Sequence, residues 1–156
     1  MRNYKHIREM VKADLASVKS IVDANQMFPA EFLDEMTAEF FSGESMEKWF
    51  VIENDDKQVI GVAFCSPERM TEGTWNLLMI AISPDEQGRG AGKQLMSHAE
   101  KLVRSLDARI LLVETSGLPE YQRTRDFYPK CGYSQVALIP EYYDKGDDKI
   151  IFMKSL

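Results

Sequence analysis

The spacing of apolar residues predicts a strand followed by two helices in the first third of the chain. Residues 4–11 are expected to form the strand, and Asp14 is expected to cap the first helix. One face of that helix carries Leu15, Val18, Ile21 and Val22. A second helix is predicted between Pro29 and Gly43, with apolar residues at Phe32, Leu33, Met36, Phe40 and Phe41.

Three strands are predicted in the middle of the chain. The segments "WFVIEND" (49–55) and "QVIGVAFC" (58–65) are rich in β-branched and aromatic residues, and the turn at 55–57 between them predicts a hairpin. The third segment, "TWNLLMIAIS" (74–83), is apolar nearly throughout. A strand that is apolar on both faces is typical of the centre of a sheet.

The last third predicts a helix, a strand, a short helix and two more strands. The helix begins near Lys93, and its apolar stripe consists of Leu95, Met96, Ala99, Leu102, Val103 and Leu106. The strand is "RILLVETS" (109–116), the short helix covers 120–128, and the final strands are "SQVALI" (134–139) and "KIIFMK" (149–154). This order predicts a mixed α/β sheet in one domain, residues 1–156, because no repeat or linker interrupts it.

A glycine-rich segment, "AISPDEQGRGAGK" (81–93), lies between the central strand and the long helix. Glycines let successive N–H groups converge on an anion, and a helix N-terminus adds partial positive charge, so this pattern is typical of phosphate binding. A P-loop is excluded because Gln87 stands where its first glycine is needed, and a dinucleotide fingerprint is excluded because Lys93 replaces its last glycine. Arg89 adds further positive charge in a chain whose net charge is −6.

Two blocks in this order resemble the GNAT superfamily of acyl-CoA-dependent N-acyltransferases. Gln87, Gly90 and Gly92 match its Gln-x-x-Gly-x-Gly loop, and "RTRDFYPKCGY" (123–133) is similar to a second family signature through Phe127, Tyr128, Gly132 and Tyr133. The resemblance implies a mixed α/β (α+β) fold. Its central sheet would be mostly antiparallel, with about seven strands and four helices, and splayed between the fourth and fifth strands.

The same resemblance implies acetyl-CoA as co-substrate and no metal. The backbone of Ile80, Ala81 and Ile82 would bind the pantetheine arm. The pyrophosphate would bind to the main-chain N–H groups of the loop, which consists of Gln87, Gly88, Arg89, Gly90, Ala91, Gly92 and Lys93.

Tyr128 matches the family tyrosine that protonates the departing sulfur, although packing beside Phe127 is the alternative. Pro129 disfavours helical geometry at the residue before it and predicts that the helix ends at Tyr128. Many members carry a glutamate on the central strand, but Asn76 stands there and cannot take a proton. Other members use a glutamate on the next strand, and Glu114 stands at a suitable place there, so the resemblance implies Glu114 as the base or amine anchor.

Two roles remain open for Glu114, because a buried carboxylate also needs a partner for structural reasons. It would either serve the acceptor amine, or accept backbone hydrogen bonds or pair with Arg123 or Arg125. The family's acceptor site would be lined by Phe28, Glu31, Phe32, Glu35, Tyr142, Tyr143 and Asp144. Acids and aromatic rings suit a cation, although a core with an acidic solvated face has the same composition.

The predicted function is an acetyl-CoA-dependent transfer of an acetyl group to a primary amine, by direct attack on the thioester. The acceptor would be a small molecule, a peptide N-terminus or a lysine. Asn76 favours an alternative, a non-catalytic acyl-CoA-binding sensor. A nucleotide site built on a degenerate P-loop is the third possibility. The sequence does not give the oligomeric state; the resemblance allows a homodimer, because dimers are common among the relatives.

The net charge, the apolar runs and the cysteines bear on which partners the protein is expected to bind and where in the cell it is expected to be. The net charge of −6 disfavours nucleic acid and anionic membranes. The start, "MRNYKHIREM", has no apolar core of a signal peptide, and the longest apolar run, Leu77 to Ile82, is too short to span a membrane. Cys65 and Cys131 match no metal or redox spacing, so a cytoplasmic protein with reduced thiols is expected. His6 and His98 are read as a strand-surface and a helix-flank residue.

Overall fold

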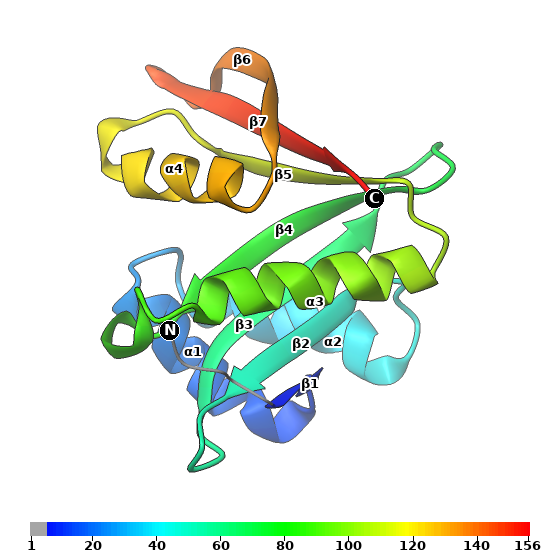
Figure 1. Ribbon diagram of the computed structural model, residues 1–156. Coiled ribbons are helices and arrows are strands. Elements are labelled where there is room, and N and C mark those ends of the chain that lie inside the picture. Colours follow the sequence, from blue (N-terminus) through cyan, green and yellow to red (C-terminus); the bar gives the residue numbers. More distant parts are fainter. Residues whose placement is uncertain (1–5) are drawn as a thin grey trace. The chain divides into compact units, whose positions relative to one another are not determined.

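The computed structural model describes residues 6–156, which form two compact units that share β4 and α3. The first unit extends to Ser66 and includes Met79–Ala99. It contains β1 (His6–Glu9), η1 (Lys12–Asp14), α1 (Leu15–Ala24), α2 (Phe32–Ser42), β2 (Lys48–Glu53), nearly all of β3 (Val59–Pro67), the end of β4 (Thr74–Ile82), η2 (Pro84–Glu86) and the start of α3 (Ala91–Ser105). Figure 1 labels these elements. Residues 4 and 5 of the predicted first strand lie outside the described residues.

The second unit consists of Pro67–Leu78 and Glu100–Leu156. After the start of β4 and the end of α3 it contains β5 (Ile110–Ser116), η3 (Pro119–Tyr121), α4 (Gln122–Lys130), β6 (Ser134–Asp144) and β7 (Asp147–Ser155). The order of helices and strands agrees with the sequence prediction. β6 is longer than expected, because the strand continues through Pro140 to Asp144 with an irregular register after Ile139.

Hydrogen bonding orders the strands β1-β2-β3-β4-β5-β7-β6 in a seven-stranded sheet. The pairings β1–β2, β2–β3, β5–β7 and β6–β7 are antiparallel, and β4–β5 is parallel. The β4–β5 ladder runs from Thr74 opposite Ile110 to Leu77 opposite Val113, and β4 continues to Ile82 beyond it. The mixed, mostly antiparallel sheet with a splay after the fourth strand is therefore confirmed.

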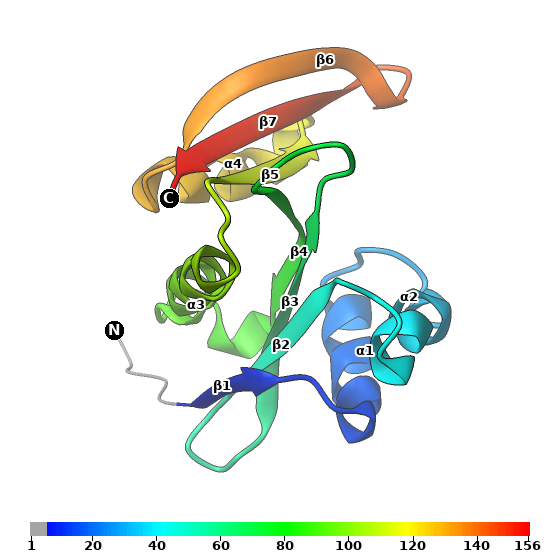
Figure 2. The same ribbon diagram turned by 90° about the vertical axis from the view of Figure 1, so that its right-hand side faces the viewer.

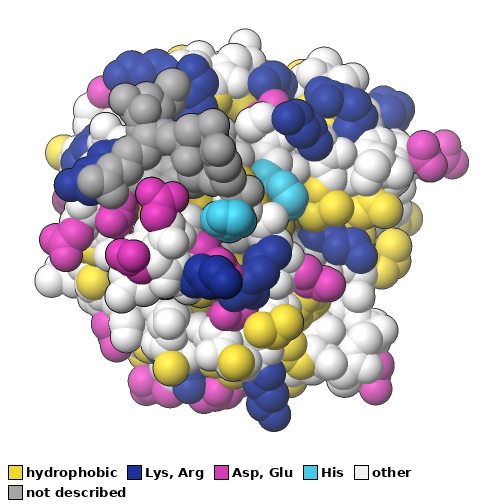
Figure 3. Space-filling model, turned by 60° about the horizontal axis from the view of Figure 1, so that its bottom comes forward, with side chains coloured by type: hydrophobic (Ala, Val, Ile, Leu, Met, Phe, Trp, Pro, Cys, Tyr) yellow, Lys and Arg dark blue, Asp and Glu magenta, His cyan; other side chains and the backbone are white. Residues whose placement is uncertain are grey.

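The core of the first unit is built on both faces of β2 and β3. Figure 2 shows α1 and α2 on one side of these strands and α3 on the other. Trp49 and Val51 belong to the cluster that holds the buried face of α1, while the ring of the intervening Phe50 lies 4.9 Å from the His98 ring on α3. This is why β2 is apolar without alternation. Figure 3 shows the histidine side chains at the surface, as expected for His6 on a strand and His98 on a helix flank.

Asp14 is the N-cap residue of α1, as predicted, but its side chain does not make the expected capping hydrogen bond. No side-chain hydrogen bond caps α1; the carboxylate instead accepts the Val11 N–H at 2.8 Å and binds the Arg8 guanidinium at 2.8 and 2.9 Å. The hydrogen bond from Arg8 holds the pKa of this buried carboxyl below its usual value, against the opposing effect of burial. The Asp14 carboxylate therefore binds Arg8 on β1 rather than the first N–H groups of α1.

The second unit packs α4 against β7 and the end of α3. The Tyr128 ring on α4 lies 5.4 Å from the Phe152 ring on β7. The Tyr133 hydroxyl donates to the buried Glu100 carboxylate at 2.9 Å, and Lys154 binds the same carboxylate at 2.8 Å. Two predictions were wrong here: α4 includes Pro129 and continues to Lys130, and Leu106 lies after the end of α3 and is exposed. Pro129 has no backbone N–H, so α4 lacks one hydrogen-bond donor in its last turn.

Gly73 sets the start of the parallel ladder between β4 and β5. Its carbonyl accepts the N–H groups of Arg109 and Ile110, which lead into β5. It has a φ of +80°, and a Cβ atom there would lie 2.9 Å from the Asp107 carbonyl oxygen. Gly146, in the β6–β7 turn, has the same φ of +80° but nothing within 4 Å of a Cβ.

These two glycines form a matched pair for a stability measurement. Gly146→Ala is expected to lower the free energy of unfolding by about 1 kcal/mol, the usual cost of a left-handed alanine. Gly73→Ala is expected to lower it by a further ~1–3 kcal/mol, because the new methyl group must displace backbone. Urea denaturation of both variants would measure the difference, and equal losses would contradict it.

Candidate functional site

The glycine loop in the first unit joins β4 to α3. Gly88 and Gly90 have φ values of +76° and +93°, which glycine adopts at little cost. The N–H groups in the first turn of a helix have no intrahelical acceptor, and the first helical bond here is donated by Gln94 to the Gly90 carbonyl at 3.1 Å. The loop therefore places the N–H groups of residues 91–93 at the positive end of α3.

The side chain of Gln87 holds the loop rather than pointing to a ligand. Its Nε2 donates to Asn25 Oδ1 at 2.9 Å and to the Ile82 carbonyl at 3.1 Å. Asn25 in turn donates to the carbonyls of Ile82 and Ile21, both at 2.9 Å. The sequence reasoning missed Asn25, since nothing in the pattern after the first helix indicates this contact.

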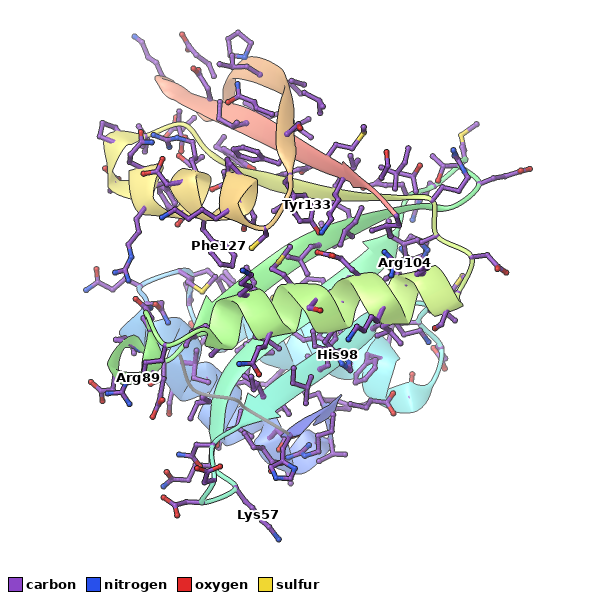
Figure 4. All side chains as sticks on the ribbon, viewed as in Figure 1. Lys57, Arg89, His98, Arg104, Phe127 and Tyr133 are labelled. Carbon is purple, nitrogen blue, oxygen red and sulfur yellow. The ribbon has the colours of Figure 1, made fainter. Side chains whose placement is uncertain are left out.

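The cations predicted at the loop are at the surface. Arg89 extends outward (Figure 4), and its guanidinium lies 3.6 Å from the Glu86 carboxylate. Lys93 is exposed at the start of α3. Left-handed glycines before a helix N-terminus and two exposed cations suit a phosphate group in charge.

In the second unit, Tyr128 is buried in α4, with 3% of its surface exposed. Its ring contacts Phe127 and Tyr133 at centroid distances of 5.4 and 6.2 Å. Burial raises the pKa of the phenol, with smaller contributions from Cys131 and Tyr143. The hydroxyl therefore stays protonated at neutral pH, and the packing alternative weighed for this residue describes its ring correctly.

Glu114 lies in a polar cluster of the second unit that also contains Glu68, Asn76, Tyr142 and Lys149. The Asn76 amide donates to Glu68 at 2.9 Å and to Glu114 at 3.0 Å. Asn76 is 2% exposed, and its Oδ1 has no hydrogen-bond partner among residues 6–156. A buried acceptor without a donor is costly, so this atom marks a place where an external N–H or O–H group would be stabilised.

Lys149 is the ion-pair partner of Glu114, at 2.6 Å between Nζ and Oε2. The two residues are diagonal neighbours, because Glu114 is opposite Ile151 and Ser116 is opposite Lys149. The ammonium also lies 3.9 Å from the centroid of the Tyr142 ring. Burial would lower the pKa of Lys149, but the hydrogen bonds with Glu114 and Tyr142 outweigh it and the pKa is raised.

The ion pairs predicted for Glu114 with Arg123 or Arg125 are absent from the described part of the chain. Arg125 donates instead to the carbonyls of Ser116 and Leu118, at 2.7 and 2.8 Å. The sequence reasoning missed Glu68 and Lys149. A charged residue at the start of the apolar strand "KIIFMK" was the available signal for Lys149, but its partner depends on strand register.

The residues predicted around the acceptor belong to both units. In the first, Phe28 packs against the core, while Glu31, Phe32 and Glu35 are exposed on or before α2. In the second, Tyr142, Tyr143 and Asp144 are exposed at the end of β6. Within the described residues neither Cys65 nor Cys131 forms a disulfide bond. The described residues contain no cluster of three or more His, Cys, Asp or Glu side chains suited to a metal ion. Nor does any helix among them have the length and apolarity to cross a membrane.

The family model for the Acetyltransferase (GNAT) family matches residues 18–133. The chain is 25% identical over 151 residues to an uncharacterized N-acetyltransferase of Methanocaldococcus jannaschii, which covers 95% of this chain and 90% of the relative. A crystal structure from Desulfovibrio desulfuricans, described as a candidate GNAT acetyltransferase, is 32% identical with a TM-score of 0.88, covering 96% and 98% of the two chains.

A variant of spermidine N-acetyltransferase from Vibrio cholerae has the same fold, with a TM-score of 0.80 at 16% identity, over 96% of this chain and 92% of that one. The chain belongs to the GNAT family and is an N-acetyltransferase.

The raised pKa of Tyr128 predicts how stability depends on alkaline pH. Unfolding exposes a phenol of pKa about 10.0, whereas the folded phenol stays protonated to higher pH. Above pH 10 the unfolded state therefore gains by losing a proton, and wild type should lose up to about 1.4 kcal/mol more per pH unit than Tyr128→Phe. Denaturation between pH 9 and 11 measures this. Tyr121→Phe, at an exposed residue, is the control, and equal slopes for wild type and Tyr128→Phe would contradict the prediction.

Proposed function

We propose that this protein transfers an acetyl group from acetyl-CoA to a primary amine. The observation that carries the proposal is the loop that joins β4 to α3, where left-handed glycines directly precede the first N–H groups of the helix. Family membership supports the reaction class. The nucleotide alternative is disfavoured because the loop lacks the P-loop residues and the family is a different one.

The cofactor would be held by backbone. N–H groups from Gln87 to Lys93 would bind the pyrophosphate, and Ile80, Ala81 and Ile82 at the end of β4 would bind the pantetheine arm. When bound, acetyl-CoA supplies a thioester, an acetyl group that is activated toward amines. Gln87 would act through its main chain, since its side chain binds Asn25 and the Ile82 carbonyl.

Residues of this chain would assist two proton transfers, protonation of the departing sulfur and loss of a proton from the amine. Tyr128 keeps its proton at neutral pH and would donate it to the departing sulfur. Glu114 already shares its charge with Lys149, so we assign it to binding and orienting the amine, with a water molecule carrying the amine's proton to solvent. Glu68 lies on the other side of Asn76 and adds a second carboxylate.

The acceptor class and the partners are also part of the proposal. A small-molecule or peptide amine that binds as a cation suits a cluster with two carboxylates and the unpartnered Oδ1 of Asn76. Nucleic acid and membranes are disfavoured by the net charge of −6, and a cytoplasmic location is proposed because Cys65 and Cys131 form no disulfide bond among the described residues. Val136, Leu138 and Ile139 are exposed on the edge strand β6, which supports a homodimer.

An amine panel with acetyl-CoA, followed by release of free thiol, tests the proposal. Wild type is expected to turn over at least one primary amine. Tyr128→Phe and Glu114→Gln are each expected to lower kcat/KM by about 10²-fold, the usual size of a proton-transfer or positioning contribution. Tyr121→Phe, at an exposed residue outside the site, should match wild type.

A thermal shift with CoA completes the experiment and separates the alternatives. Stabilisation of wild type and of both variants, with loss in Gly90→Ala, would support the loop as the cofactor site. Stabilisation without thiol release across the panel would favour the sensor that Asn76 suggests. If ATP with magnesium stabilised the protein and CoA did not, the cofactor assignment would be wrong.

A further inference from the structure

The polar cluster of the second unit has a charge imbalance. Glu68 and Glu114 carry two negative charges, joined through the Asn76 amide, and Lys149 carries one positive charge. Within the described residues, the Glu68 carboxylate pairs with no lysine or arginine. Among Glu68, Glu114 and Lys149 one negative charge therefore remains, while the nearby Asp147 carboxylate accepts a hydrogen bond from the Ser116 hydroxyl.

The unpartnered Asn76 Oδ1 indicates what kind of group the cluster lacks. The atom is buried and can only accept a hydrogen bond, while the Nδ2 of the same amide donates to both carboxylates. Reversing the amide would direct the oxygen at two carboxylates, so the orientation is determined by its contacts. The missing group is a donor, and beside two carboxylates a positively charged donor is the most stabilised.

The ammonium of Lys149 is held in the same way that a bound alkylammonium would be. It has a carboxylate oxygen at 2.6 Å and an aromatic ring at 3.9 Å, and its side chain is 9% exposed. Tyr142 is brought over it by the irregular part of β6, where Glu141 has a φ of +53° and donates its N–H to Asp148. The remaining nearby groups are Tyr143, Asp147 and Ser116, and the last two bind each other.

We propose that Lys149 permanently fills one of two neighbouring ammonium-binding positions, so that the acceptor is an amine with a single positive charge. The open position is formed by Glu68, Asn76 and Glu114, and the filled one by Glu114 and Tyr142. A diamine or polyamine would bring a second ammonium to a position that the chain's own lysine occupies. Lys149 is thus a specificity-determining residue. The inference rests on the proposed function for the identity of the bound amine as the acceptor.

A first experiment tests the filled position without using activity. Lys149→Ala removes the ammonium and leaves room for a small alkylammonium ion. Propylammonium at millimolar concentration is expected to raise the melting temperature of Lys149→Ala by more than that of wild type, because the variant offers two ammonium positions and wild type only the open one. The double variant Lys149→Ala with Glu114→Gln lacks the carboxylate and should not respond. If propylammonium failed to stabilise Lys149→Ala more than wild type, the inference would be overturned.

A second experiment measures selectivity with butylamine and 1,4-diaminobutane, which differ by one ammonium group. Wild type is expected to show the higher kcat/KM with butylamine. In Lys149→Met the ratio of diamine to monoamine should rise about tenfold, the combined size of a modest ion pair and a cation–π contact. Lys149→Arg keeps the charge and should retain the wild-type ratio. A wild-type preference for the diamine, or an unchanged ratio in a folded Lys149→Met, would contradict the inference.

The two experiments distinguish a failure of the proposed function from a failure of the inference about Lys149. If wild type acetylates no amine, the proposed function is wrong, and the response of Lys149→Ala to propylammonium still decides whether an ammonium position exists. If wild type acetylates amines but selectivity ignores position 149, the proposed function stands and the inference falls. Should Lys149→Ala not fold, the wild-type ratio and the Lys149→Met titration with propylammonium decide the same question.

Discussion

The early end of the β4–β5 ladder is the constraint on which the rest of the molecule depends. Parallel pairing stops at Leu77 and Val113, although β4 continues to Ile82. Each backbone N–H and C=O group needs a partner, so a strand that loses its neighbour must find others. Ile82 finds them in its own unit, through Asn25 and Gln87, and the loop that follows is held in place by the same two side chains.

The family signatures have two different physical roles. In the loop, Gly88 and Gly90 supply left-handed backbone angles and amides without side chains. Gln87 instead supports the loop through its side-chain hydrogen bond to Asn25. In the second signature, Gly132 adopts a φ of +90° after α4 and Tyr133 ties the end of that helix to Glu100. These contacts hold Tyr128 in its buried position. Much of what defines the family by sequence is therefore support for a few functional atoms.

The sequence predicted the elements because burial pattern and local conformation coincide in them. The end of α2 at Gly43 and the turn before β3 followed from residue types alone. Partner choice did not follow, because it depends on which residues tertiary structure brings together. The Asp14 carboxylate binds Arg8 instead of capping the nearby helix. For Glu114, an arginine nearby in the chain was one alternative partner, and the structure pairs it with Lys149 on another strand. The bulge that places Tyr142 over Lys149 depends on register, which no local pattern specifies.

The hydrogen bond between the side chains of Asn25 and Gln87 has a consequence for the evolution of the first unit. It ties the last turn of α1 to the end of β4 and to the loop, so these three segments cannot drift independently. A substitution at the C-terminal end of α1 would therefore change the position of the loop amides, although the substituted residue contacts no ligand. Altered cofactor affinity among descendants of this protein would then trace to helix packing, at positions that a comparison of binding residues alone would overlook.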